Sequence, residues 1–234
     1  MGDPLADQQR LTPPTASWPD GTRVWLIDPS LVHNDTLARG VGWLDADEGA
    51  RAARFVRDDD RRLFQVAHLA CRVIVGAALD RRPAEVAWHR APCPACGGPH
   101  GRPVVVGGGV EFSVSHTRGL VAIALAAQPV GVDVEGDPTD AWPDLVGWLH
   151  PNEQREVAAA TDPVVAFGRA WTRHEAHLKA LGIGLGREPS LDHLGAGQQP
   201  VGSPAGFALR DLPTPAGFHG AVVTRRDPGV RPDG

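Results

Sequence analysis

Residues 171–185 read Trp171-Thr-Arg-His-Glu-Ala-His-Leu-Lys-Ala-Leu-Gly-Ile-Gly-Leu185 and include Lys179, the only lysine among 23 cationic side chains. Residues 171–182 of this stretch belong to a predicted helix at 163–182 that ends in glycine. Glu175 lies one turn before Lys179, on the same face. Lysine is a compact cation with transferable protons, whereas arginine is a planar fork that stays protonated. Lys179 is therefore a candidate for chemistry. The alternative is a surface Glu/Lys pair that stabilises the helix by about 0.2–0.5 kcal/mol.

Two carboxylates precede this helix in the run Val132-Asp133-Val134-Glu135. The alternation of a strand places Asp133 and Glu135 on one face, where two anions repel each other unless a cation lies between them. Oxygen ligands of this kind suit Mg²⁺. The alternative is a solvated strand end. With Glu175 and Lys179 added, three carboxylates and one ammonium would suit phosphoryl or pyrophosphate chemistry.

Composition limits the class of protein. The 234 residues are 42% hydrophobic with a net charge of −5, which predicts a globular chain and argues against nucleic acid as the main partner. No apolar stretch is expected to approach the roughly 20 residues of a membrane span, and the N-terminus is polar. Three cysteines do not make a disulfide framework. We therefore expect a cytoplasmic protein without membrane contact.

The order of elements predicts an α+β fold. Strands are expected at 24–27, 110–114, 120–126, 130–134, 206–209 and 220–224. Helices are expected at 45–57, 59–79, 151–160 and 163–182, with Arg61, Arg62 and Arg72 on a solvated face. The similar order in both halves suggests two pseudo-symmetric α+β subdomains, without a sequence repeat to prove it. The predicted boundaries are a flexible leader at 1–21, subdomains at 22–127 and 128–226, and a frayed tail at 227–234.

Weaker signals lie in the connections. Cys93-Pro-Ala-Cys96 with His100 resembles part of a zinc site or a redox pair, but a structural zinc needs four ligands, so a loop thiol pair without function is favoured. Ser115-His116 follows a strand and suits contact with an anionic ligand, although a polar hairpin tip explains it equally. Arg102 could likewise contact an anionic ligand or be an ordinary polar residue of the loop.

Taken together, four segments resemble the Sfp-type 4′-phosphopantetheinyl transferase family. They are His100-Gly-Arg-Pro103, Phe112-Ser-Val-Ser-His-Thr117, Gly131-Val-Asp-Val-Glu135 and Trp171-Thr-Arg-His-Glu-Ala-His-Leu-Lys-Ala-Leu-Gly-Ile-Gly184. Their order and spacing across about residues 100 to 185 match the family. Each string alone is common, whereas the ordered set is specific. A weaker likeness extends to Arg54-Phe55 and to residues 60–72.

This resemblance implies that coenzyme A binds in a cleft between the two halves. It implies that a serine of an apo acyl or peptidyl carrier protein attacks the β-phosphate, and that 3′,5′-ADP leaves. Asp133, Glu135 and Glu175 resemble the Mg²⁺ ligands, with Glu175 also taking the serine proton and Lys179 neutralising the departing phosphate. The implied contacts to the coenzyme are Ser115, His116, Arg102, Arg51, Arg54 and Arg62. A monomer is expected, because both halves lie in one chain.

Two residues depart from the family pattern. His174 stands where the family usually has lysine, so weaker or pH-dependent phosphate binding is expected. Leu63 stands where many members have another arginine. These departures motivate an alternative, a non-catalytic module that binds coenzyme A or a carrier protein. A third interpretation is a metal-dependent enzyme that cleaves another diphosphate.

Overall fold

The computed structural model describes residues 13–138 and 142–227, which form an α+β fold as predicted. The helices are α2 (Asn34–Gly40), α3 (Ala46–Ala53), α4 (Asp58–Leu79), α5 (Trp142–Leu145), α6 (Pro151–Ala159) and α7 (Pro163–Leu181). The strands are β1 (Ala16–Ser17), β2 (Arg23–Ile27), β3 (Trp88–Arg90), β4 (Pro103–Val105), β5 (Glu111–Thr117), β6 (Leu120–Ala126), β7 (Val130–Gly136), β8 (Phe207–Asp211) and β9 (Phe218–Arg225).

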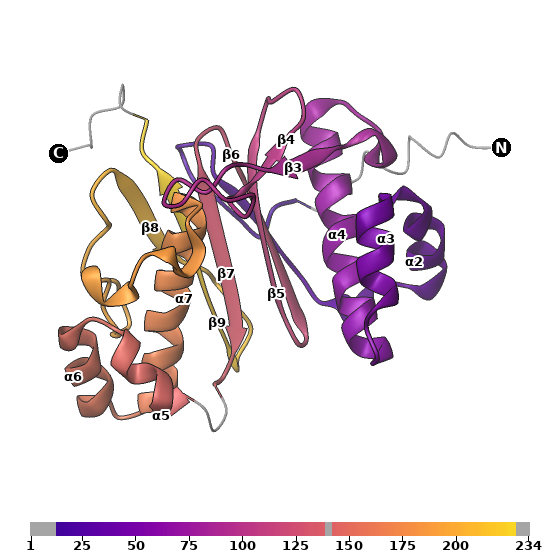
Figure 1. The fold of residues 1–234 in the computed structure, drawn as a ribbon. Coiled ribbons are helices and arrows are strands. Elements are labelled where there is room, and N and C mark those ends of the chain that lie inside the picture. Colours follow the sequence, from indigo (N-terminus) through magenta and orange to yellow (C-terminus); the bar gives the residue numbers. More distant parts are fainter. Residues whose placement is uncertain (1–12, 139–141, 228–234) are drawn as a thin grey trace.

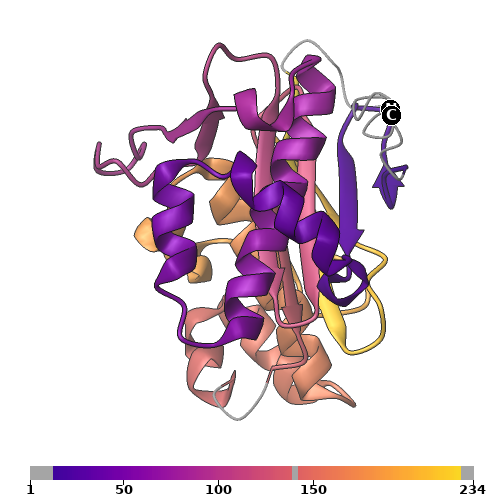
Figure 2. The ribbon, with the colours of Figure 1, turned by 90° about the vertical axis from the view of Figure 1, so that its right-hand side faces the viewer.

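Two antiparallel sheets lie between two layers of helices (Figure 1). The first sheet has the order β1-β2-β6-β5 and the second the order β7-β9-β8, while β3 and β4 form a separate ribbon. Helix α4 covers the outer face of the first sheet, with α3 and α2 beside it (Figure 2). Helix α7 covers the outer face of the second sheet. Strands β5 and β7 lie side by side where the sheets meet, and Val132 N donates to Ser113 Oγ there at 3.1 Å.

Three apolar clusters hold these layers together. One lies between α4 and the first sheet, one between the two sheets, and one between α7 and the second sheet. Every residue of β6 is buried, because this strand is covered on both faces. That explains why residues 120–126 form a continuous apolar run rather than an alternating one.

Helix α4 corrects one expectation from the sequence. By length and composition it is apolar enough to cross a membrane, and it is the one such helix in the part of the chain that the structure describes. Half of its apolar window is nevertheless buried inside the protein, against β5 and β6. The core helix of a domain meets the same criteria, and the packing of α4 is that of a core helix.

Arg72 is also placed differently from the prediction. Instead of facing solvent, it is 2% exposed and binds Glu48 Oε2 through Nε at 2.9 Å and Nη2 at 2.6 Å. It also donates to the Val86 carbonyl at 2.6 Å, and its guanidinium lies 4.7 Å from the centre of the Trp88 ring. A buried charge is costly unless it is paired and hydrogen-bonded, so this network explains why an arginine of α4 can be buried in the core.

The same local arrangement occurs twice along the chain. The sequence Val-Gly-Trp-Leu at 41–44 precedes α3, and the same four residues at 146–149 precede α6. Both helices begin with a capping box whose glutamate, Glu48 or Glu153, is buried and binds the long helix that follows. This repeat was not recognised in the sequence, because it is short and separated by about a hundred residues.

Other boundaries differ in detail. Strand β5 continues through Thr117, so the turn to β6 is only Arg118 and Gly119. The short α2, β3 and β4 were not predicted, and the helix expected at 45–57 ends at Ala53. Within the expected leader, residues 1–12 lie outside the described residues and β1 pairs with β2. The expected tail lies outside them from residue 228.

Gly131 of β7 is where strand and helix backbones approach most closely. A Cβ added there would lie 2.1 Å from the Ala176 carbonyl oxygen and 2.3 Å from the Ala180 nitrogen of α7. Replacing Gly131 with Ala should therefore lower the free energy of unfolding by about 3 kcal/mol, because α7 must move off β7. Urea unfolding followed by circular dichroism measures this.

The matched control is Gly147→Ala, where an added Cβ meets no atom within 4 Å. Its effect should stay within about 0.5 kcal/mol. Equal stability of the two variants would show that α7 is not held at this distance.

Candidate active site

Side chains from three elements meet where the two sheets join. Lys179 of α7 donates to Asp133 Oδ1 of β7 at 2.7 Å and to Ser115 Oγ of β5 at 2.9 Å. Ser115 Oγ donates in turn to Asp133 Oδ1 at 2.8 Å. Asp133 and Ser115 are buried, whereas the Lys179 side chain is 30% exposed. The ammonium group is thus held in place while part of the side chain still reaches solvent.

The strand alternation of β7 positions the acidic residues. Val132 and Val134 face the core between the sheets, so Gly131, Asp133 and Glu135 share the opposite face, toward α7. Because α7 approaches so closely at Gly131, its side chains at i and i+4 come down beside these acidic residues. The sequence correctly predicted this shared face.

Electrostatic interactions link the three carboxylates. Burial raises the pKa of Glu135 to about 7, and the nearby Asp133 and Glu175 charges act in the same direction, while a hydrogen bond from Thr117 and the charge of Lys179 oppose them. Burial, followed by the Asp133 charge, likewise raises the pKa of Glu175 above its ordinary value. The structure therefore brings together the three acidic groups predicted from two separate elements.

These carboxylates do not form a tight cluster. In the described chain, the ligand atoms of Asp133, Glu135 and Glu175 do not all lie within 4.8 Å of one another. Lys179 occupies one oxygen of Asp133, and the other, Oδ2, is buried without a hydrogen-bond partner. An unpartnered carboxylate oxygen in the protein interior is costly, and it is an available ligand for a cation.

A cavity of about 180 Å³ lies beside this cluster and is lined by several nitrogen-bearing side chains, of which Arg90, Arg102 and Lys179 are cationic. Arg90, His100 and Arg102 come from the β3–β4 region and Lys179 comes from α7. Burial, and then the charge of Arg51, lower the pKa of Arg90. A larger hollow, about 590 Å³, lies beside α6 and contains none of these residues. The smaller cavity is the one whose chemistry suits an anionic ligand.

Arg90 was not predicted as a site residue. It stands in a three-residue strand, and nothing in its sequence context distinguishes it from the other arginines. Its position depends on the pairing of β3 with β4, which the sequence did not predict. The hydroxyl of Thr117 at the end of β5 was also overlooked, although it lies within a quoted motif.

The predicted coenzyme contacts Arg102, Ser115 and His116 differ in their exposure and in their hydrogen-bond partners. Arg102 lines the cavity and pairs with Glu111, Nε to Oε2, at 3.0 Å. Ser115 binds Asp133 and Lys179, as described above. His116 is exposed at the end of β5, and loss of hydration together with the charges of His68, Lys179 and Arg51 lowers its pKa.

The predicted arginines of the first half differ from one another. The Arg51 guanidinium lies 5.4 Å from the centre of the Phe64 ring. Its charge contributes to the lowered pKa values of His116 and Arg90, so Arg51 lies near the cavity. Arg54 is exposed at the end of α3. Arg62 instead binds the 29–34 segment, donating to Asn34 Oδ1 at 2.7 Å and to the Val32 carbonyl. Its role as a coenzyme contact stays a prediction, and its donors already have protein partners.

His174 was expected to make phosphate binding weaker or pH-dependent, but it is not among the residues that line the cavity. His174 is 2% exposed and its Nε2 lies 2.7 Å from Glu153 Oε2, so it joins α7 to α6. Burial alone would raise the pKa of Glu153, but hydrogen bonds from His174 and from the Leu194 and Gly195 N–H groups hold it below its ordinary value. His174 is thus a structural partner of a buried carboxylate.

The region that carries most of these residues resembles known proteins. The sequence profile of the 4′-phosphopantetheinyl transferase superfamily matches residues 129–222, which span β7, α7 and the strands after it. Over this region the chain resembles the superfamily.

Curated relatives extend the likeness beyond that region. The chain is 31% identical over 163 residues to the L-aminoadipate-semialdehyde dehydrogenase-phosphopantetheinyl transferase of Schizosaccharomyces pombe, covering 62% of each chain. It is 29% identical over 182 residues to the 4′-phosphopantetheinyl transferase HetI of Nostoc sp., covering 74% of this chain and 73% of the relative. The match thus spans less than two thirds of the length of the Schizosaccharomyces pombe protein.

The raised pKa of Glu135 predicts how stability changes with pH. The folded protein holds this proton up to about pH 7, whereas the unfolded chain loses it near 4.5, so stability should fall as pH rises between these values. Replacing Glu135 with Gln should remove this loss. In EDTA at pH 8 the variant should be more stable than the parent by about 1–2 kcal/mol, less than the full shift because the carboxyl is partly exposed.

Urea unfolding at pH 4 and pH 8 measures the effect. The advantage of Glu135→Gln should disappear at pH 4, where both states of the parent are protonated. An advantage of the same size at both values would show that charge at Glu135 is not its cause.

Proposed function

We propose that this protein transfers the 4′-phosphopantetheine group from coenzyme A to a serine of an apo carrier protein and releases 3′,5′-ADP. The observation that carries the proposal is the contact of Lys179 with Asp133 and Ser115, flanked by Glu135 and Glu175 and open to a cationic cavity. Such a site combines groups for an anionic diphosphate with a base for a hydroxyl. The likeness of residues 129–222 to the 4′-phosphopantetheinyl transferase superfamily supports the same reaction.

The acidic residues fit a magnesium ion. Asp133 Oδ2 lacks a partner, and the mutual repulsion of the carboxylates would be relieved by a divalent cation. We assign Asp133, Glu135 and Glu175 as the residues that would hold it. Bound there, Mg²⁺ would neutralise charge on the diphosphate oxygens of coenzyme A.

The protein side chains perform the remaining tasks. Glu175, whose pKa is raised, accepts the proton of the attacking serine hydroxyl. The serine oxygen forms a bond to the β-phosphorus as the bond from that phosphorus to the bridging oxygen breaks. Lys179 balances the negative charge that develops on the departing 3′,5′-ADP. Arg90 and Arg102 bind phosphate oxygens from the cavity wall.

Partner, location and oligomeric state belong to the same proposal. The carrier would be an acyl or peptidyl carrier domain of fatty acid, polyketide or nonribosomal peptide synthesis. We also propose a cytoplasmic monomer, because the two sheets already pack against each other in one chain.

The binding-module alternative loses its two motivations in the structure. His174 binds Glu153 and therefore takes no charge away from a ligand site. Leu63 packs against the core beneath α4, where an additional arginine would need a partner. Neither departure weakens the Lys179 contacts.

The direct test is incubation of the protein with coenzyme A, Mg²⁺ and a panel of apo carrier proteins, read by intact mass. Transfer should add about 340 Da to a carrier serine. Coenzyme A binding without a mass gain on any carrier would favour the binding module. Release of nucleotide without any carrier would favour cleavage of another diphosphate.

Lys179→Arg tests the proposed role of the ammonium. The variant keeps the charge, but its larger planar fork does not fit between two acceptors at 2.7 and 2.9 Å, so kcat/KM should fall about a hundredfold. The Kd for coenzyme A and the melting temperature are measured in parallel.

Arg155→Lys is the matched control, because Arg155 is exposed on α6 and bonds only Asn152 among the contacts found for its side chain. Its kcat/KM should match that of the parent. Full activity of Lys179→Arg would remove Lys179 from the mechanism.

A further inference from the structure

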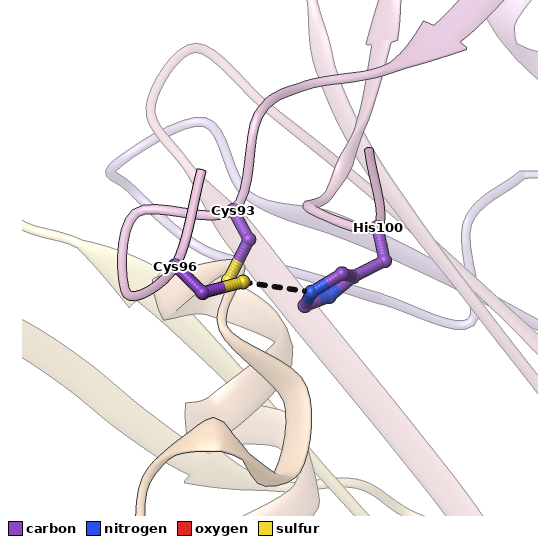
Figure 3. A group of neighbouring side chains, drawn as sticks. All are labelled: Cys93, Cys96 and His100. Carbon is purple, nitrogen blue, oxygen red and sulfur yellow. Dashed lines mark hydrogen bonds between the residues drawn. The ribbon is translucent and has the colours of Figure 1, made fainter. Parts of the chain in front are cut away.

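Three metal-ligating side chains gather in the connection between β3 and β4, apart from the carboxylates. The ligand atoms of Cys93, Cys96 and His100 all lie within 4.8 Å of one another. Cys96 Sγ lies 3.0 Å from His100 Nε2. In Figure 3 the two sulfur atoms lie side by side and face the imidazole ring. Among the described residues, no other set of three His, Cys, Asp or Glu side chains meets this distance.

The backbone of this loop is folded around the Cys93 sulfur. The Ala95 N–H and the Cys96 N–H both donate to it. Gly97 N donates to the Cys93 carbonyl at 2.7 Å, and Gly97 has a φ of +73°, which glycine adopts readily. The tight turn therefore places the Cys93 sulfur close to two backbone N–H groups, and the Cys96 sulfur lies beside it.

His100 is held against this turn by Gly98. The His100 N–H donates to the Gly98 carbonyl at 2.9 Å. A Cβ added at Gly98 would lie 2.9 Å from His100 Cδ2 and 3.3 Å from Cys96 Sγ, so only a glycine lets the ring lie this close to the thiol. The imidazole position thus depends on the same backbone as the two cysteines.

We propose that Cys93, Cys96 and His100 bind one Zn²⁺ ion, with water as the fourth ligand, and that this ion fixes the β3–β4 connection against the end of α7. Two thiolates and one imidazole are ligands that zinc favours. The thiolates would balance the charge of the ion. This assignment replaces the interpretation of the pair as a loop without function.

The distances agree with such a site. With bonds of about 2.3 Å to sulfur and 2.0 Å to nitrogen, a tetrahedral ion separates its ligand atoms by about 3.5–3.8 Å. The three ligand atoms lie within 4.8 Å of one another, and the distance of 3.0 Å between Cys96 Sγ and His100 Nε2 needs to increase by only about 0.5 Å. Cys96 and His100 are exposed, so the ion has an entry path and room to adjust.

The position of the loop gives the ion a structural consequence. Arg102 packs over the end of α7, where a Cβ added at Gly182 would lie 3.4 Å from its backbone nitrogen. Gly101 N and Arg102 O each bond Ala91, which closes the loop at its base. His100 and Arg102 both line the cationic cavity. A metal at the tip of the loop would therefore hold one wall of that cavity in place.

The test uses the full chain, purified with a reductant and measured for zinc by mass spectrometry of the metal content. We expect about one zinc per chain. After removal of zinc, titration with Co²⁺ should give the strong visible and thiolate charge-transfer absorption of a tetrahedral cobalt–thiolate site. Metal content is measured without coenzyme A or a carrier, so failure here is distinct from failure of the proposed function.

The variants are Cys96→Ser and His100→Ala, which change exposed side chains and should leave the fold intact by circular dichroism. Each should lose the bound zinc and the cobalt spectrum. The third cysteine provides the matched control, because Cys71 is buried in α4 outside the loop, and Cys71→Ala should keep both. Gly98→Ala removes no ligand but displaces the ring, so it should weaken cobalt binding about tenfold or more.

Three outcomes would overturn the proposal. The parent with free thiols could bind neither metal, zinc could remain in Cys96→Ser and His100→Ala, or Cys71→Ala could lose the metal as completely as they do. A Cys93–Cys96 disulfide that persists in the presence of the reductant would also contradict it.

Discussion

The contact of α7 with β7 at Gly131 is the constraint on which the site depends. With no side chain on Gly131, the helix lies so close to the strand that an added Cβ would almost touch its backbone. Residues on the same faces, two positions along β7 and one turn along α7, are then brought within hydrogen-bonding distance, and Lys179 meets Asp133 at 2.7 Å. A wider spacing would leave Asp133 buried without any cation, at a large cost in desolvation. The close packing of α7 on β7 therefore both stabilises the fold and assembles the site.

Both halves contribute charged groups to the place where they meet. The carboxylates and Lys179 come from β7 and α7, whereas Arg90 and Arg102 come from the β3–β4 region of the first half. A diphosphate ligand with a divalent cation needs carboxylates and several cations, and only the two halves together supply the carboxylates, Lys179 and both arginines. The Val-Gly-Trp-Leu segment and the capping-box glutamate occur once in each half, whereas the charged groups of the site differ between the halves.

The sequence predicted what depends on local periodicity and missed what depends on pairing between distant segments. Alternation along residues 130–136 and helical spacing along 163–181 placed Asp133, Glu135, Glu175 and Lys179 on facing surfaces, because both periods are fixed by backbone geometry. The burial of Arg72 and His174 could not be predicted in this way, since each depends on a glutamate more than twenty positions earlier. The sequence did not predict that Cys93, Cys96 and His100 form a metal site. Their spacing in the sequence identifies possible ligands but does not give the distances between the ligand atoms.

The single lysine makes physical sense when it is compared with the buried arginines. Arg173 directs its fork to Asp211 and to the Gly195 and Gly197 carbonyls, so several donors are used at once. At position 179 the acceptors are one carboxylate oxygen and one hydroxyl, on two strands that lie side by side. A guanidinium there would direct only one or two of its five donors to these acceptors. A compact ammonium satisfies both acceptors and keeps one donor for a ligand, so the constraint that forms the site also selects the residue.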